Sequence, residues 1–342
     1  MKQHLNTLYV TTQGAYLAKD GAAITVRIEK KVRLRLPLHN LDGIVCFGRV
    51  AASPSLMAAC AEAGVSISFM SMYGKLQARV LGFTSGNVLL RRQQYRMSDS
   101  PESSLAIARS IVLAKIANCR TTLLRSARDA KDPSKEEILR DAAQRLKSSL
   151  HQANTVSNMD ALRGMEGEAA SSYFSAFNAM LVDDHSLQLS GRSRRPPQDP
   201  VNALLSFLYV ILSHDVRSAC ESTGLDSQVG FLHRDRPGRP SLALDLMEEF
   251  RPVLVDRFVV TLINRKQIGL VDFETQPSGG IILKDNARRE ILKGWQERKQ
   301  ETMRHEFLGE SVSLGLFIHL QARLLARHIR GDLDAYPPCF WK

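Results

Sequence analysis

The chain has 342 residues and a formal net charge of +11, with 44% hydrophobic and 24% charged residues. This length allows two domains with well-filled cores, and the composition is ordinary for a soluble globular protein. The basic excess favours a polyanionic partner, either nucleic acid or an anionic membrane surface. The membrane alternative is weak, because no apolar run approaches the ~20 residues that span a bilayer. The start MKQHLNTLYV also lacks the apolar stretch of a signal peptide.

The cysteines are scattered along the chain and form no CxxC pair. They are Cys46, Cys60, Cys119, Cys220 and Cys339. An odd number without regular spacing favours reduced, buried thiols over a disulfide framework or a zinc finger. We therefore expect a cytoplasmic protein.

Residues 1–96 are predicted to form a β-rich N-terminal domain. The segment AYLAKDGAAITVRI holds two strand-like runs around a hairpin signal, and VRLRLPL alternates as a half-exposed strand does. In SPSLMAACAEAG, Ser53 is a good N-cap, Pro54 suits the first helical position and Gly64 suits the stop. Strand-like runs flank this helix, GIVCFG before it and VSISFMS after it, which predicts a parallel pair with a right-handed crossover. LQARVLGF adds one more strand.

The polar segment MSDSPESS, residues 97–104, is predicted to be a linker. Residues 105–342 then show helical patterns, beginning with LAIARSIVLAKIANCRTTLLRSAR and KDPSKEEILRDAAQRLKSSL. Asp199 before Pro200 marks the start of a further apolar helix in DPVNALLSFLYVILSHD. The predicted fold class is therefore α+β with two domains, a β-rich N-terminal one followed by a mainly α-helical one.

The helical segment LRGMEGEAASSYFSAF contains the first candidate for a functional side chain. Glu166 lies beside the apolar face of this helix and shares a stripe with small residues, which let another element approach closely. From this segment alone, a boundary glutamate with a salt-bridge partner remains the ordinary alternative.

A second candidate stretch reads GFLHRDRPGRPSLALDLMEEFR. His233 comes first, and three acids follow at positions i, i+3 and i+4: Asp245, Glu248 and Glu249. Such positions are neighbours on a helix, so the acids repel one another unless a cation or an arginine lies between them. Arg251 is the structural alternative, and a divalent metal is the functional one. Carboxylates suit Mg²⁺ and Mn²⁺, and the imidazole of His233 shifts the preference toward Mn²⁺.

The histidine is surrounded by basic residues. Arg234, Arg236 and Arg239 are close enough in sequence to contact the phosphates of a nucleic acid, although a solvated loop has the same composition. Sequence spacing alone does not bring Glu166 next to His233, so the metal-site hypothesis joins two separate segments.

Four motifs in this order closely resemble the Cas1 family of CRISPR-associated adaptation endonucleases and integrases. They are LRGMEGEAASSYF, RRPPQDPVNALLSFLYVIL, GFLH and LALDLMEEFRP. The resemblance runs through nearly the whole chain and includes YGKLQARVLGFTSGNVLLRRQQY at the domain junction, with the same order of a β-rich and an α-helical part.

The resemblance implies four active-site residues, which are Glu166, His233, Asp245 and Glu248. Of these, Asp245 would be a further active-site acid, and the other three would bind Mg²⁺ or Mn²⁺. Glu166 is preferred to Glu168 because glycine follows it, as in the family pattern. Glu248 is preferred to Glu249 because it lies three residues after Asp245, although many relatives carry aspartate there.

The resemblance also implies a function. The protein would be a metal-dependent DNA endonuclease and integrase that inserts captured DNA fragments as spacers into a CRISPR array, by attack of a 3′-hydroxyl on a phosphodiester. The DNA supplies the nucleophile, so no catalytic serine or cysteine is needed. We expect a homodimer, built largely by the N-terminal half, that assembles with the small partner protein Cas2 on double-stranded DNA.

Two pairs of arginines are the preferred phosphate contacts outside the histidine loop, Arg91 with Arg92 near the junction and Arg194 with Arg195 before PPQDP. Structural salt bridges are the alternative for each. Two other functions also remain open. One is a structure-selective or non-specific nuclease without a role in integration, and the other is a non-catalytic DNA-binding scaffold.

Overall fold

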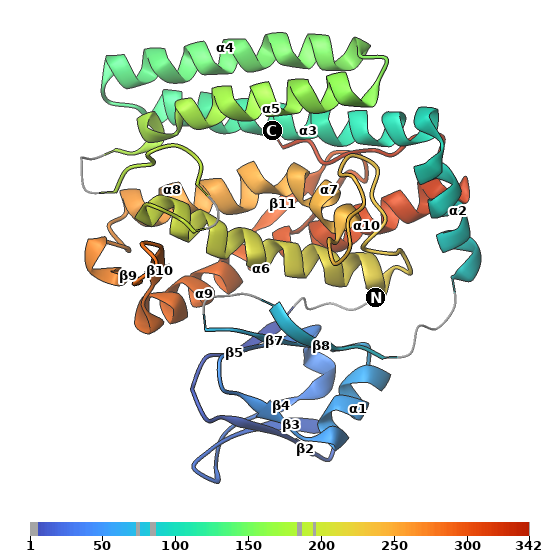
Figure 1. Ribbon diagram of the computed structural model, residues 1–342, viewed down its shortest axis with the longest axis vertical. Helices are drawn as coiled ribbons and strands as arrows, with labels where there is room; N and C mark the ends of the chain where they lie inside the picture. Colours follow the sequence, from blue (N-terminus) through green and yellow to red (C-terminus); the bar gives the residue numbers. More distant parts are fainter. Residues whose placement is uncertain (1–5, 73–75, 83–86, 183–186, 194–195, 342) are drawn as a thin grey trace. The chain divides into compact units, whose positions relative to one another are not determined.

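A computed structural model describes residues 6–72, 76–82, 87–182, 187–193 and 196–341. The chain divides into two compact units (Figure 1). Unit 1 comprises residues 1–86 and 285–301, and unit 2 comprises residues 87–284 and 302–342. Strands dominate the N-terminal part and helices dominate the rest, which confirms the predicted α+β class.

Unit 1 is built on two four-stranded sheets. The first has the order β1-β5-β7-β8 and the second the order β4-β3-β2-β6. The strands are β1 Thr7–Val10, β2 Tyr16–Asp20, β3 Ala23–Ile28, β4 Lys31–Pro37, β5 Gly43–Phe47, β6 Ala51–Ala52, β7 Ser66–Met70 and β8 Leu76–Val80. In the first sheet β1, β5 and β7 are parallel, and β8 closes the row antiparallel to β7.

Helix α1, Pro54–Glu62, connects β5 to its parallel neighbour β7, as the helix and strand signals predict. The Ser53 side chain caps this helix by accepting from Leu56 N at 3.2 Å. Buried residues of both sheets and of α1 form one core, which includes Leu17, Ile44 and Leu56.

A second helix of unit 1 comes from much later in the chain. Helix α9, Asp285–Gln300, donates to β1 and the segment after it. Gln296 Nε2 donates to Thr7 O, Lys299 Nζ donates to Thr7 Oγ1 at 3.3 Å, and Arg289 Nε donates to Thr11 Oγ1 at 3.2 Å. β1 is an edge strand of its sheet, and α9 bonds one of its backbone carbonyls and two threonine hydroxyls in or after it.

Unit 2 is mainly helical. Its helices are α2 Val88–Asp99, α3 Pro101–Asp129, α4 Pro133–Thr155, α5 Met159–Ser175, α6 Pro200–Ser222, α7 Ser241–Phe250, α8 Arg257–Asn264 and α10 Leu314–Arg330. A π-helix, Arg251–Asp256, joins α7 to α8, and short 3₁₀ turns lie at Phe177–Met180 and Leu270–Asp272. Two small antiparallel hairpins complete the unit, β9 Phe273–Thr275 with β10 Ile281–Leu283, and β11 Thr302–His305 with β12 Glu310–Ser313.

Local capping signals start several of these helices. Ser100, Asp132 and Asp199 each accept a backbone N–H with their side chains, and a proline follows each cap at the first helical position. Helix α6 is long and apolar enough for a membrane span by composition alone. However, 61% of its most apolar stretch is buried within the protein, so core packing accounts for this composition.

The predicted linker over residues 97–104 is wrong. Helix α2 continues to Asp99, Ser100 caps the next helix, and Pro101 begins α3. Serine and proline are typical of loops, but here they form the first turn of a helix. The division between units falls instead after residue 86, and α9 interrupts the predicted C-terminal domain.

Candidate metal-binding active site

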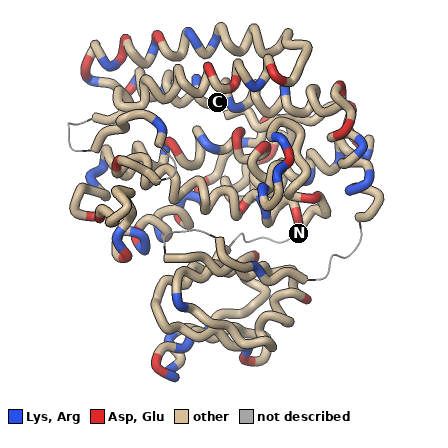
Figure 2. Tube along the Cα trace, in the orientation of Figure 1, with Lys and Arg blue, Asp and Glu red and all other residues tan. Residues whose placement is uncertain are grey.

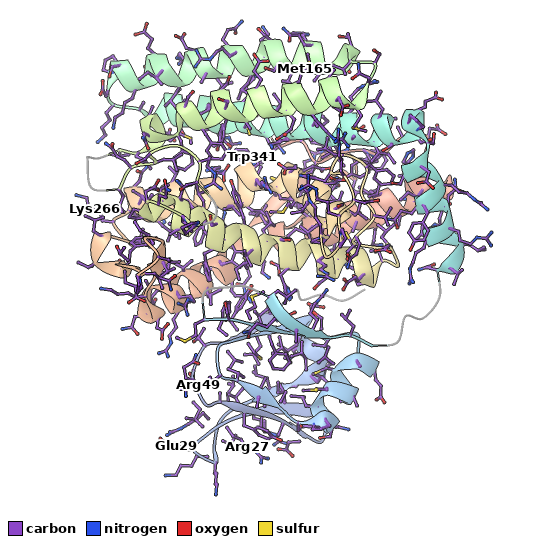
Figure 3. The ribbon with its side chains drawn as sticks, in the orientation of Figure 1. Arg27, Glu29, Arg49, Met165, Lys266 and Trp341 are labelled. Carbon is purple, nitrogen blue, oxygen red and sulfur yellow. The ribbon has the colours of Figure 1, made fainter. Side chains whose placement is uncertain are left out.

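The site is centred on a buried lysine that contacts acids from two other helices. Lys115 on α3 donates to Glu166 Oε1 on α5, and its Nζ lies 2.6 Å from Glu248 Oε2 on α7. Figure 3 labels Met165, the neighbour of Glu166 on α5. The Lys115 side chain is 9% exposed, that of Glu248 is 3% exposed and that of Glu166 is 27% exposed. The two predicted carboxylates are therefore brought together around a positive charge, with Glu166 on the open side.

Glu248 is surrounded by basic side chains. Arg251 Nη1 lies 2.8 Å and His233 Nε2 lies 4.0 Å from its Oε1 atom. Burial alone would raise the pKa of Glu248, but Arg251, Lys115 and His233 more than offset this and lower the pKa to about 2. Glu248 is thus a carboxylate at neutral pH, as a metal ligand must be. Arg251 is the salt-bridge partner that the sequence spacing offered as an alternative.

Asp245 holds the histidine turn from behind. Its carboxylate accepts the backbone N–H groups of Phe231, Leu232 and His233 at 2.6, 3.0 and 2.9 Å, and its Oδ1 lies 2.7 Å from His233 Nδ1. The His233 Nδ1 atom is thereby engaged, and Nε2 is the ring nitrogen on the side of Glu248. Asp245 is fully buried, and its contacts hold the turn that carries His233.

Steric crowding explains why the first residue of the GFLH motif is a glycine, Gly230. A Cβ atom on Gly230 would lie 2.7 Å from Asp245 Oδ2 and 2.8 Å from the backbone carbon of Ser241. A side chain at this position would push the turn away from Asp245 and with it His233.

The two acids excluded by sequence reasoning lie elsewhere. Glu168 is exposed on α5. Glu249 is fully buried and accepts from Tyr336 OH at 2.7 Å and Cys339 N at 2.7 Å, in the C-terminal segment. Burial raises the pKa of Glu249 to about 7. Asp245, Glu248 and Glu249 are thus close in sequence on α7 but contact three different parts of unit 2.

The sequence analysis did not single out two buried charged residues, Lys115 and Asp256. Lys115 lies in the apolar run SIVLAKIANC. A lysine inside such a run indicates a buried charge with an acidic partner. Asp256 ends the π-helix and accepts from Tyr209 OH at 2.5 Å. Its pKa is raised to about 6 by burial. Pro252 has no N–H for the carbonyl of Glu248, which favours the wider π turn directly after the site.

The predicted DNA-contacting arginines differ in their surroundings. Arg234 pairs with Asp160 at 2.9 Å, Arg236 is exposed and Arg239 is half-buried. Arg163 pairs with the same Asp160 oxygen at 3.1 Å and donates to Leu232 O at 2.7 Å. A hollow of about 580 Å³ opens beside His233 and is lined by both Arg163 and Arg234.

The junction arginines lie on α2, where basic positions recur along the helix (Figure 2). Arg91 Nε donates to Gly224 O at 3.2 Å, whereas Arg92 is exposed. Arg92 is therefore the freer of the two for a phosphate contact. Arg194 and Arg195 lie outside the described residues.

The donor set fits a hard divalent cation. Two carboxylates and an imidazole suit Mg²⁺ or Mn²⁺, and the Lys115 ammonium already lies where the two acids need a cation. As arranged, no group of three or more His, Cys, Asp or Glu side chains within the described ranges is close enough to enclose an ion. A metal held by Glu166 and Glu248 would therefore have to displace the Lys115 ammonium from between them.

The fold and the site together define a class: two-part α+β proteins with a carboxylate–imidazole centre in the helical part. A family model described as CRISPR associated protein Cas1 matches residues 8–297. The chain is 48% identical to the CRISPR-associated endonuclease Cas1 1 of Chlorobaculum tepidum and 53% identical to the CRISPR-associated endonuclease Cas1 2 of Rhodospirillum rubrum. Each of these alignments covers 100% of both chains.

Solved structures with a similar fold include a Cas1 protein. A Cas1 protein from Thermotoga maritima has a TM-score of 0.81 at 25% identity, covering 96% of this chain and 97% of that one. A casposase bound to its integration product shares the fold, with a TM-score of 0.82 at 22% identity, covering 99% of this chain and 95% of that one. The chain belongs to the Cas1 family.

Proposed function

We propose that the protein is a metal-dependent DNA endonuclease and integrase that inserts captured DNA fragments into a CRISPR array. The observation that carries this proposal is the meeting of Glu166 and Glu248 at the buried Lys115 ammonium, with His233 Nε2 4.0 Å from Glu248 Oε1. The full-length relatives named as endonucleases support it. The net charge of +11 also favours a polyanionic substrate.

In the proposed reaction, Glu166, His233 and Glu248 would hold Mg²⁺ or Mn²⁺. The bound ion would polarise the scissile phosphate and orient the attacking 3′-hydroxyl. Asp245 keeps His233 Nδ1 engaged, so that Nε2 is the nitrogen available on the side of Glu248. Arg92, Arg234, Arg236 and Arg239 would contact DNA phosphates. One phosphorus–oxygen bond forms to the incoming 3′-oxygen as the bond to the leaving 3′-oxygen breaks, so no protein nucleophile takes part.

The proposed assembly is a homodimer that works with Cas2. The chain resembles part of a Cas6-RT-Cas1–Cas2 complex, with a TM-score of 0.83 at 26% identity, covering 99% of this chain and 36% of that one. In unit 1, β4 is a seven-residue edge strand with Val32 53% and Leu34 39% exposed. An exposed apolar edge favours pairing with another chain, which supports a dimer formed by this half.

The test compares Glu166→Ala with Glu168→Ala, an exposed glutamate on the same helix as a matched control. We expect Glu166→Ala to lose DNA cleavage and strand transfer, because one ligand and one negative charge leave a sparse site, while most DNA affinity survives. Glu168→Ala should stay active. The assay is integration of a 3′-hydroxyl fragment into a supercoiled CRISPR-repeat plasmid with Mn²⁺, with DNA binding measured in parallel.

The outcomes separate the candidate functions. Cleavage without joined DNA would indicate a nuclease that takes no part in integration. DNA binding that ignores both metal and the loss of Glu166, with neither reaction, would indicate a scaffold. Full activity in both variants would show that α5 carries no metal ligand.

A further inference from the structure

The segment Tyr336–Trp341 has no regular secondary structure, yet its side chains lie inside unit 2. Tyr336, Cys339 and Trp341 are 3%, 4% and 6% exposed, whereas Phe340 between them is 41% exposed. The segment therefore packs Tyr336, Cys339 and Trp341 against the rest of unit 2 and leaves Phe340 exposed. We call residues 336–341 the tail segment.

The tail segment binds α7 through Glu249. The Glu249 carboxylate accepts from Tyr336 OH at 2.7 Å, from Cys339 N at 2.7 Å and from Gln321 Nε2 at 3.1 Å. Gln321 on α10 also donates to Tyr336 OH at 2.8 Å and to Pro337 O at 3.1 Å. The buried acid is thereby fully hydrogen-bonded, and three separate parts of unit 2 meet at one side chain.

The tail segment binds α3 through Asn118. The Asn118 amide donates to Cys339 O at 2.9 Å and to Glu249 O at 2.8 Å, and its oxygen accepts from Trp341 N at 2.8 Å. Asn118 is fully buried, so breaking any of these bonds would leave a polar group unpaired. One amide therefore ties α3, α7 and the tail segment together.

Trp341, labelled in Figure 3, ends the segment beside two arginines. The Arg125 guanidinium of α3 lies 3.9 Å from the ring centroid, and that of Arg257 at the start of α8 lies 4.4 Å from it. Two cation–π contacts therefore hold this buried indole in place.

Each anchoring residue is next to a residue of the active site. Asn118 follows Lys115 by three positions on α3, and Glu249 follows Glu248 directly on α7. Lys115 and Glu248 are the pair joined at 2.6 Å. Asn118 donates to the Glu249 backbone carbonyl, so a residue that holds the tail segment also joins α3 to α7 beside this pair.

We propose that the tail segment positions α7 against α3, so that Tyr336 and Trp341 are positioning residues for the metal ligand Glu248. This inference rests on the proposed metal site, and in it the tail segment acts through Glu249, the residue after Glu248 on α7. Tyr336 touches neither metal nor DNA in this scheme. Its hydroxyl acts through Glu249 on the helix that carries Glu248.

The experiment uses the full chain and three substitutions, Tyr336→Phe, Trp341→Ala and the exposed control Phe340→Ala. Mn²⁺ affinity is measured from the electron paramagnetic resonance signal of free Mn²⁺, and hydrogen exchange of the α7 amides is measured without metal. We expect Tyr336→Phe to bind Mn²⁺ about tenfold more weakly, the lower end of the loss typical of outer-shell changes. Its α7 amides should exchange faster, and Phe340→Ala should match the wild type in both measurements.

Tyr336→Phe removes a single oxygen atom, so it decides the matter if Trp341→Ala fails to fold. Wild-type Mn²⁺ affinity in Tyr336→Phe would overturn the inference. Absence of Mn²⁺ binding by the wild type, with faster α7 exchange in Tyr336→Phe, would overturn the proposed function and leave the tail segment as a support of α7. Absence of both effects would overturn both.

Discussion

Replacing Lys115 with methionine tests whether the ammonium and the metal compete for the same carboxylates. Methionine keeps an unbranched side chain of similar length but removes the charge between Glu166 and Glu248. In the absence of metal, the two acids then lose the cation that joins them. We expect the variant to be less stable than the wild type but to gain more stability from Mn²⁺.

The surroundings of each acid determine how much stability the Lys115→Met variant loses. Removing one partner of a buried ion pair typically costs about 3–5 kcal/mol. Glu248 keeps Arg251 at 2.8 Å, and the Glu166 side chain is 27% exposed and can be hydrated, so we expect a loss at the lower end, about 3 kcal/mol. In the wild type, a metal must displace the ammonium before it binds. A tenfold tighter Mn²⁺ site in Lys115→Met corresponds to about 1.4 kcal/mol of additional stabilisation by saturating metal.

The assay is urea unfolding of both proteins in chelator and in saturating Mn²⁺, which gives four free energies of unfolding. Lys115→Leu serves as a second uncharged variant with a different shape. Equal stabilisation of wild type and variants by Mn²⁺ would refute the reasoning, because it would mean that the ammonium does not occupy the metal position. A variant as stable as the wild type in chelator would show that the two acids do not need the cation.

Two further predictions concern DNA binding and pH. Arg92→Ala should reduce the slope of log affinity against log salt by about 0.9 on duplex DNA. Arg91→Ala loses a hydrogen bond to Gly224, so it should also lower the stability of the protein. Equal slopes in salt titrations of Arg92→Ala and the wild type would exclude a phosphate contact by Arg92. Asp256, with its pKa raised from 3.8 to about 6, contributes stability that is complete below its unfolded pKa and is lost as pH rises through the folded pKa. Relative to Asp256→Asn, the wild type should therefore lose up to about 3 kcal/mol between pH values of about 4 and 7 in urea unfolding, and a constant difference would contradict the raised pKa.

Local signals in the sequence predicted most of the secondary structure. Ser53 with Pro54 and Asp199 with Pro200 start helices as expected, because capping depends on neighbouring residues alone. The same chemistry misled the reading of residues 97–104, since serine and proline favour loops as well as helix starts. The assignment of α9 to unit 1 depends on contacts across almost 300 residues of chain, which no local pattern contains.

The candidate site was likewise predictable only where it depends on local sequence. The spacing of the acids on α7 placed them on adjacent helical positions, but their partners come from other elements: the histidine turn for Asp245, Lys115 and Arg251 for Glu248, and the tail segment for Glu249. Only the resemblance to a family joined α5 to the histidine turn. Physical reasoning from spacing alone left these two segments unconnected.

The late position of α9 has a consequence for synthesis of the protein. A ribosome produces the chain from its N-terminus, so the strands of unit 1 emerge long before residues 285–301 exist. Until then, the edge of β1 lacks the donors that α9 brings to Thr7 and Thr11. An open strand edge is a template for pairing with other chains. The nascent chain therefore passes through a stage in which β1 lacks these donors, and the time needed to translate the intervening residues sets how long that stage lasts.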